Sequence, residues 1–94
     1  MWVSRDEAIG PIHYLIVSSD AYNAAFADRR VIAVEIDTRA LYHGIYREPV
    51  NDVGTALLDR LVWVTRDSLT THVGDLHPTR HAPVTAQIRE LIGN

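Results

Sequence analysis

The sequence predicts a small, mainly β domain of the α+β class, in which several short strands form a strongly curved sheet or barrel and a C-terminal helix closes it. Three observations support this fold: short apolar, β-branched runs recur along the chain, turn-forming residues separate them, and one amphipathic run lies near the C-terminus. The 94 residues fit one domain with a modest core, so we expect a single domain over residues 1–94.

The composition is that of an ordinary globular domain, with 47% hydrophobic and 22% charged residues. No apolar run reaches membrane-spanning length and no signal-peptide pattern opens the chain, so we expect no membrane association and a cytoplasmic protein. The absence of cysteine excludes disulfides and thiolate metal sites. The formal charge of −3 argues against a broad basic surface for nucleic acid, but all nine basic residues are arginines, which bind phosphate in a bidentate way.

The chain begins with a segment of little periodicity, Met1 to Gly10, which we interpret as an irregular arm or edge segment that ends at the Gly10-Pro11 break. The first clear strand is Ile12 to Ser18, with His13 near its start. A histidine beside a core strand is usually structural, but it is also the one side chain in this strand that transfers protons near neutral pH. Ser19 or Asp20 then caps a short helical turn through Ala25.

The strongest strand signal is the run from Arg30 to Ile36, which only Glu35 interrupts. Asp37, Thr38 and Arg39 follow at its C-terminal end, where a carboxylate, a hydroxyl and a guanidinium project from a rigid support. Two interpretations stay open for these residues: a polar turn that ends the strand, or a functional site.

The remaining elements follow in order. We expect a strand over 41–47 with a bulge at Gly44, followed by a surface loop over 48–54. Two further strands are expected over 56–64 and 70–76. A helix should begin at Pro83 and end at Gly93, and its apolar side carries Val84, Ile88, Leu91 and Ile92.

Three segments, in this order, resemble the MazF/PemK toxins, the ribosome-independent mRNA interferases of bacterial toxin–antitoxin pairs. The Leu15–Asn23 segment resembles the family's strand and its Ser-Asn/Asp-x-x-Asn turn, and Val31–Arg39 resembles the strand that delivers the catalytic hydroxyl. The third segment, Gly54–Gly93, resembles the family's Gly, Asp-Gln-Ile, Gly-x-Leu and Leu-Gly landmarks, with Arg60 in place of the glutamine.

The resemblance implies an SH3-like barrel of about five strands of the CcdB/PemK/MazF kind, a homodimer, and a groove for single-stranded RNA that an antitoxin peptide blocks. It also implies an endoribonuclease that needs no metal or other cofactor, in which the ribose 2′-hydroxyl attacks the neighbouring phosphate. Positioning and charge stabilisation are then the protein's main tasks. Thr38 is the candidate for the catalytic hydroxyl, Asp37 is its rival, and Arg39 supplies charge.

The chain departs from the family pattern in two places. Residues Met1 to Ile9 are too few for the family's first strand and the loop after it, so we expect that strand to be missing or remodelled. The family's basic residue before the first core strand falls on Ile12-His13, so we expect His13 to act as the acid, or Arg5 to fold in from the arm. The candidates for RNA binding are Arg5, Arg60 and Tyr14.

Other interpretations remain open. The His77-x-x-x-His81 spacing suits zinc on a helix, but Pro78 and the lack of cysteine favour a solvated linker. Trp63 suits a core or a dimer interface, and Trp2 suits a packing anchor or a base-stacking residue. Two further functions are a catalytically weakened module that binds RNA or antitoxin, and, ranked last, a gyrase poison of the CcdB type.

Overall fold

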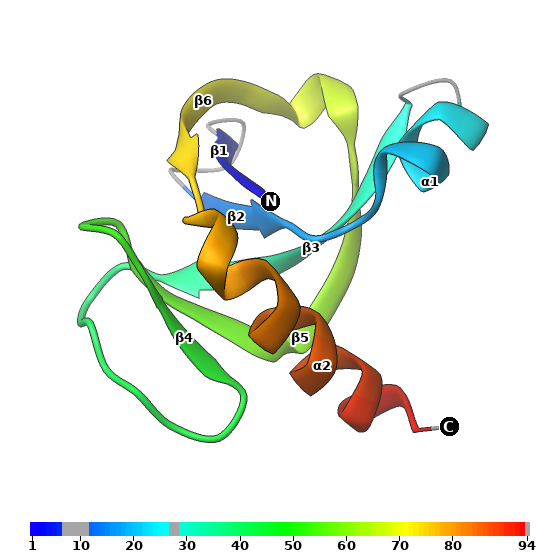
Figure 1. Cartoon of the computed structure of the whole chain (residues 1–94). Helices are drawn as coiled ribbons and strands as arrows, with labels where there is room; N and C mark the ends of the chain where they lie inside the picture. Colours follow the sequence, from blue (N-terminus) through cyan, green and yellow to red (C-terminus); the bar gives the residue numbers. More distant parts are fainter. Residues whose placement is uncertain (7–11, 27–28, 94) are drawn as a thin grey trace.

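The computed structural model describes residues 1–6, 12–26 and 29–93, so the expected break at Gly10-Pro11 lies outside the described residues. The strands form one antiparallel sheet in the order β4-β5-β3-β2-β1-β6, which curls into a half-barrel (Figure 1). The strands are β1 (Trp2–Asp6), β2 (Ile12–Ile16), β3 (Arg30–Asp37), β4 (Arg47–Val50), β5 (Gly54–Thr65) and β6 (Leu69–Asp75). The helices are α1 (Asp20–Ala25) and α2 (His81–Ile92), with short 3-10 turns η1 (Arg66–Ser68) and η2 (Pro78–Arg80).

Strand β3 lies at the centre of the sheet because it pairs with β2 on one side and with β5 on the other. Its predicted apolar run explains this position: Val31, Ala33, Val34 and Ile36 are all buried. The pairing with β5 joins Arg30 to Thr65 at one end and Asp37 to Thr55 at the other, with a register shift between Val34 and Ile36. That irregularity bends the strand just before its polar end.

Two clusters of buried side chains lie on opposite faces of β3. Val34 and Ile36 belong to the larger cluster, which α2 covers with Val84 and Ile88 (Figure 1). Val31 and Ala33 belong to a smaller cluster with Ile16, against which Trp2 packs. Both faces of this strand are therefore covered, and the predicted helix from Pro83 is confirmed, although it begins at His81. None of the described helices is long and apolar enough to cross a membrane.

The predicted helical turn after β2 is also confirmed. Ser19 caps α1 by accepting a hydrogen bond from the backbone N–H of Tyr22 at 3.1 Å. The Ser18 hydroxyl donates to Asn23 Oδ1 at 2.6 Å and accepts from the backbone N–H of Ile32 at 3.0 Å. These bonds tie the turn to the start of β3.

The predicted strand over 41–47 is wrong. Leu41, Tyr42 and Ile45 are exposed, so this segment gains no burial from a strand and forms a loop instead. The strand is β4, which begins at Arg47 and occupies half of the predicted surface loop over 48–54. Pro49 is tolerated there because β4 is an edge strand.

The expectation of an irregular arm or edge segment is wrong as well, and of the two alternatives for the first strand, missing or remodelled, the structure excludes the first. Trp2–Asp6 forms β1, which pairs with both β2 and β6. Val3 and Ser4 are buried in it, so packing rather than sequence periodicity defines this strand. The sheet therefore has six strands rather than about five.

Candidate functional site

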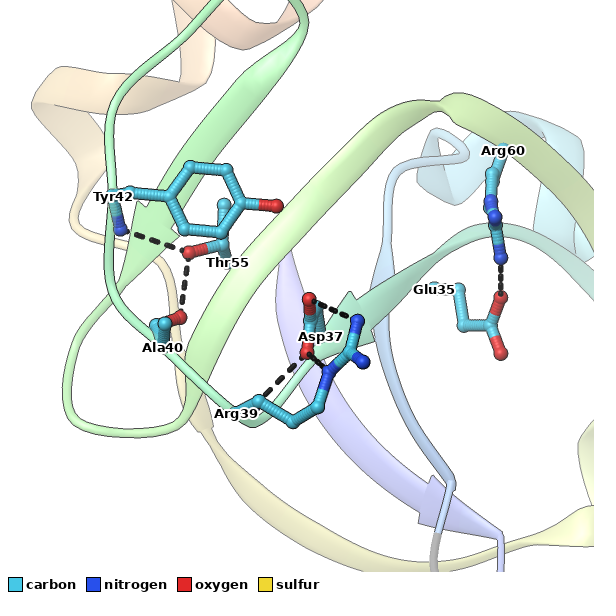
Figure 2. Close-up of polar contacts among 7 residues, drawn as sticks. All are labelled: Glu35, Asp37, Arg39, Ala40, Tyr42, Thr55 and Arg60. Carbon is cyan, nitrogen blue, oxygen red and sulfur yellow. Dashed lines mark hydrogen bonds and ion pairs between the residues drawn. The ribbon is translucent and has the colours of Figure 1, made fainter.

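The C-terminal end of β3 carries an ion pair between two residues that the sequence analysis singled out (Figure 2). Arg39 binds Asp37 in a bidentate way, with Nε 2.9 Å from Oδ1 and Nη2 3.0 Å from Oδ2. The backbone N–H of Arg39 donates to the same Oδ1 at 3.0 Å. The aspartate therefore both turns the chain at the end of the strand and fixes the guanidinium.

This geometry lowers the pKa of Asp37 to about 2, through the hydrogen bonds from the Arg39 side chain and backbone N–H. Asp37 is thus a permanent carboxylate near neutral pH, and too weak a base to take a proton efficiently from a hydroxyl. The pair lies at the surface, since the Arg39 side chain is 88% exposed. Two of the five guanidinium N–H donors point to Asp37, which leaves three for another anion.

Thr38 lies between these two residues and is exposed. It lines a hollow of about 280 Å³, together with Glu35, Ile36, Asp37, Arg39, Leu57 and Arg60. The structure therefore brings together three predicted catalytic residues and one predicted RNA-binding residue, Arg60.

Arg60 reaches the hollow from β5 and forms an ion pair with Glu35 of β3, with Nη1 3.3 Å from Oε2 (Figure 2). The sequence analysis treated Glu35 only as an interruption of an apolar run. Its distance of two residues from Asp37 was the available signal, because strand residues i and i+2 lie on the same face. The hollow thus has two cations and two carboxylates on its wall.

Two residues at the start of β5 hold this end of β3 in place. A Cβ on Gly54 would lie 2.8 Å from Thr38 Cα and closer still to the Asp37 carbonyl, so only glycine permits this approach of the two strands. The Thr55 hydroxyl donates to the Ala40 carbonyl at 2.8 Å and accepts from the backbone N–H of Tyr42 at 3.1 Å (Figure 2). Thr55 is fully buried, so it anchors the loop that follows the site.

His13 lies outside this hollow. It pairs with Ile36 across β2 and β3 and lies two residues before the buried Leu15. Strand residues i and i+2 share a face, so the His13 side chain lies on the face of the larger core cluster. Its Nδ1 is buried and has no hydrogen-bond partner among the described residues. Burial and, secondarily, the charge of Arg5 lower the pKa of His13, so the ring is neutral near pH 7.

Arg5 and Tyr14 likewise do not line the hollow beside Thr38. Arg5 pairs with His13 across β1 and β2, and Tyr14 pairs with Glu35 across β2 and β3. Tyr14 therefore lies one strand away from the Arg60–Glu35 ion pair, on the same face as Glu35. It also packs against the smaller core cluster.

The histidines considered for zinc have other contacts. His77 Nδ1 accepts from the backbone N–H of Thr79 at 3.2 Å, and His81 Nε2 lies 3.0 Å from the Leu76 carbonyl. Each ring thus stabilises the turn that leads into α2. Within the described part of the chain, no three histidine, aspartate or glutamate side chains gather as metal ligands would.

No family model and no curated protein matches this sequence. Solved structures do match its fold. An endoribonuclease from a mycobacterial species, solved with its cognate antitoxin, is 21% identical, with a TM-score of 0.80 over 98% of this chain and 91% of that chain. The Mycobacterium tuberculosis toxin MazF-mt6 is 13% identical, with a TM-score of 0.77 over 98% and 96%. A MazE-MazF structure from Deinococcus radiodurans is 18% identical, with a TM-score of 0.77 over 98% and 90%. The expected MazF-like fold is therefore confirmed.

Proposed function

We propose that this chain, which has the fold of MazF toxins, is an endoribonuclease toxin that cleaves single-stranded RNA at the hollow beside Thr38. One observation carries the proposal: on that fold, the exposed Thr38 at the end of the central strand lines one open hollow together with Arg39 and Arg60. A hydroxyl and two guanidinium groups along one hollow suit a phosphodiester, because each group donates hydrogen bonds to phosphate oxygens.

In the proposed reaction, the ribose 2′-hydroxyl attacks the adjacent phosphorus and the bond from phosphorus to the 5′-oxygen breaks. The products are a 2′,3′-cyclic phosphate and a 5′-hydroxyl. Negative charge grows on the phosphate oxygens in the transition state, so Thr38 and the two arginines stabilise it by hydrogen bonds and charge. Asp37 is a positioning residue that holds the Arg39 guanidinium at the edge of the hollow.

Proton transfer is proposed to pass through water in the open hollow. Asp37 is too acidic to act as an efficient base, and His13 lies on another face of the sheet. The sequence-based role of His13 as the acid is therefore replaced, in this proposal, by a structural role in β2. Arg5 and Tyr14 are proposed to contact RNA outside the hollow, since neither lines it.

The test is cleavage of single-stranded RNA by the purified protein in EDTA. The wild type is expected to cleave, and Thr38→Ala to lose about 100-fold or more in rate, the loss typical for a transition-state hydrogen-bond donor. Thr79→Ala is the matched control, because it removes an exposed threonine hydroxyl outside the hollow and should cleave as the wild type does. Equal rates for the two variants would contradict the proposal.

A second candidate function is a module that binds RNA or antitoxin without cutting. The charge balance of the hollow favours it, because each arginine there is already paired with a carboxylate. Binding of RNA without cleavage, equally by wild type and Thr38→Ala, is the result that supports this alternative.

We further propose an antitoxin partner and a homodimer. Two of the solved structures with this fold are described as complexes with a cognate antitoxin or with MazE, which supports the first of these partners. Exposed apolar side chains such as Ile45 and Ile92, at 84% and 71% exposure, are consistent with a partner surface. The molar mass in solution, measured by light scattering, tests the homodimer.

A further inference from the structure

A second cationic hollow lies at the opposite end of β3 from Thr38. It measures about 490 Å³ and is lined by Ala25, Phe26, Arg29, Arg30, Trp63 and Thr65. Arg30 and Asp37 are the two ends of β3, so at ~3.3 Å per residue these two residues are roughly 23 Å apart along the strand.

The arginines of this hollow differ from those beside Thr38 in their partners. Arg39 and Arg60 are each paired with a carboxylate, whereas Arg29 and Arg30 have no carboxylate partner among the described residues. In a chain with a net charge of −3, two neighbouring guanidinium groups that no described carboxylate pairs with concentrate positive charge locally.

Aromatic rings hold one of these arginines in place. The Arg30 guanidinium lies 4.0 Å from the centroid of the Phe26 ring and 5.1 Å from that of Trp63. Its Nε is buried and lacks a hydrogen-bond partner among the described residues. The planar group is therefore held by stacking on the two rings, and its Nε–H stays available as a donor among the described residues.

Trp63 adds a stacking surface beside the charges, since its side chain is 61% exposed although it was expected in a core or an interface. Guanidinium groups that accept phosphate, next to an exposed aromatic ring on which a base stacks, are the combination that binds single-stranded nucleic acid without sequence preference. An acidic peptide would use the charges but would not need the ring.

We propose that Arg29, Arg30 and Trp63 form a second binding site for single-stranded RNA, separate from the hollow beside Thr38. This inference rests on the proposed function, because it assigns the site to the flank of the same substrate. The arginines bind phosphates of that flank, and a base stacks on Trp63.

The test measures binding rather than cleavage. The probe is a labelled single-stranded RNA of about twelve nucleotides, which at ~3.4 Å per stacked nucleotide exceeds the distance between Arg30 and Asp37. Its 2′-hydroxyls are methylated, so it is not cleaved. The combined Arg29→Ala and Arg30→Ala variant should bind this RNA at least about tenfold more weakly. The negative slope of log K against the logarithm of the salt concentration should become shallower by about 1.4, or ~0.7 per lost phosphate contact.

Two further variants separate charge from stacking and from folding. Trp63→Leu should weaken binding about fivefold or more without changing the salt slope. Arg29→Ala alone changes an exposed side chain, so it reports on the site even where the double variant unfolds. Arg89→Ala is the matched control, because it removes an exposed arginine that does not line the hollow, and it should bind as the wild type does.

The same affinity and salt slope for Arg29→Ala and Arg89→Ala would overturn the inference. Loss of poly-glutamate binding in the double variant, with RNA binding intact, would overturn it in favour of a peptide site. Cleavage of unmethylated RNA is measured separately. A wild type that does not cleave contradicts the proposed function alone, whereas a wild type that cleaves but binds RNA independently of these residues contradicts this inference alone.

Discussion

Asp37 illustrates how one side chain shapes the candidate site. Its carboxylate accepts three hydrogen bonds from Arg39, and these bonds fix the turn that exposes Thr38. The same bonds determine how the aspartate titrates, so its protonation reports on the geometry of the site.

We predict that Asp37 titrates at about 2, well below its ordinary value of 3.8. Because the pKa in the folded state is depressed, the stabilisation from this pair is complete above about 4 and is lost as the pH falls through about 2. Carbonyl-carbon NMR shifts followed against pH measure this directly. Arg39→Gln should return the Asp37 pKa towards 3.8, and an unchanged value in that variant would show that Arg39 does not cause the shift.

His13 gives a second prediction at the residue scale. Burial and Arg5 lower the pKa of His13 in the folded state below 6.5. As the pH falls through this range, the unfolded chain therefore binds more protons than the folded chain does. Stability should therefore decrease from about pH 7 to more acidic pH, and His13→Gln should reduce this dependence. Urea unfolding of both proteins at several pH values measures it. If His13→Gln stays folded yet loses RNA cleavage, the structural role proposed for His13 is wrong.

At the scale of elements, the approach of β5 to the end of β3 decides the shape of the hollow. We predict that Gly54→Ala destabilises the fold by about 1–3 kcal/mol, because the added methyl group would overlap the backbone of Asp37 and Thr38. Chemical denaturation measures the loss. Gly44→Ala is the matched control, since its Cβ would meet only the flexible Arg47 side chain at 3.4 Å. Equal stability of the two variants would contradict the close approach.

The edge strand β4 is tied to the turn before α2 by an ion pair. Glu48, only 3% exposed, accepts bonds from Arg80 Nε at 2.9 Å and Nη2 at 2.8 Å. We predict that Arg80→Leu lowers the melting temperature by several degrees, because it leaves a buried carboxylate without its partner. Arg89→Leu, an exposed change on α2, should have little effect. A melting temperature that is the same for both variants would contradict a stabilising role for the pair.

Some of these strands and helices could be predicted from the sequence, and others could not. The strand β3 was predictable from its continuous apolar, β-branched run, and the helix α2 from the helical spacing of its apolar residues. The strand β4 was not, because one of the two residues that it buries is the charged Glu48, and Arg80, which pairs with Glu48, lies 32 residues away. The strand β1 was missed because its own sequence has no clear period and it is held by pairing with β2 and with β6, which is distant in sequence.

For the candidate site, the polar run at the end of β3 led us to expect Asp37, Thr38 and Arg39 to project together, and all three line one hollow, while their catalytic roles stay predictions. Arg60 lines the same hollow because β5 pairs with β3. The family resemblance identified Arg60 as a motif position but did not place it beside these three residues. The separation of His13 from Thr38 depends on which face of β2 it occupies. That face is fixed by register, and a change of register by one residue would reverse it.

At the scale of the whole molecule, the arginines of the two hollows differ in their partners. Those beside Thr38 form ion pairs with Asp37 and Glu35, whereas Arg29 and Arg30 at the other end of β3 form none with a carboxylate in the described part of the chain. The proposed substrate would therefore be attracted mainly by the second hollow and cleaved at the first. Under the proposed function, this division would let a chain with a net charge of −3 bind a polyanion.

The most direct test of the account is the chemical nature of the cleaved end. Single-stranded RNA is incubated with the protein in EDTA and the products are analysed by mass spectrometry, beside an RNA that carries a single 2′-deoxy sugar at the cleaved position. The account predicts a 2′,3′-cyclic phosphate from the first RNA and no cleavage of the second at that position. A linear phosphate formed directly, or cleavage beside the deoxy sugar, would contradict attack by the 2′-hydroxyl and with it the role proposed for Thr38.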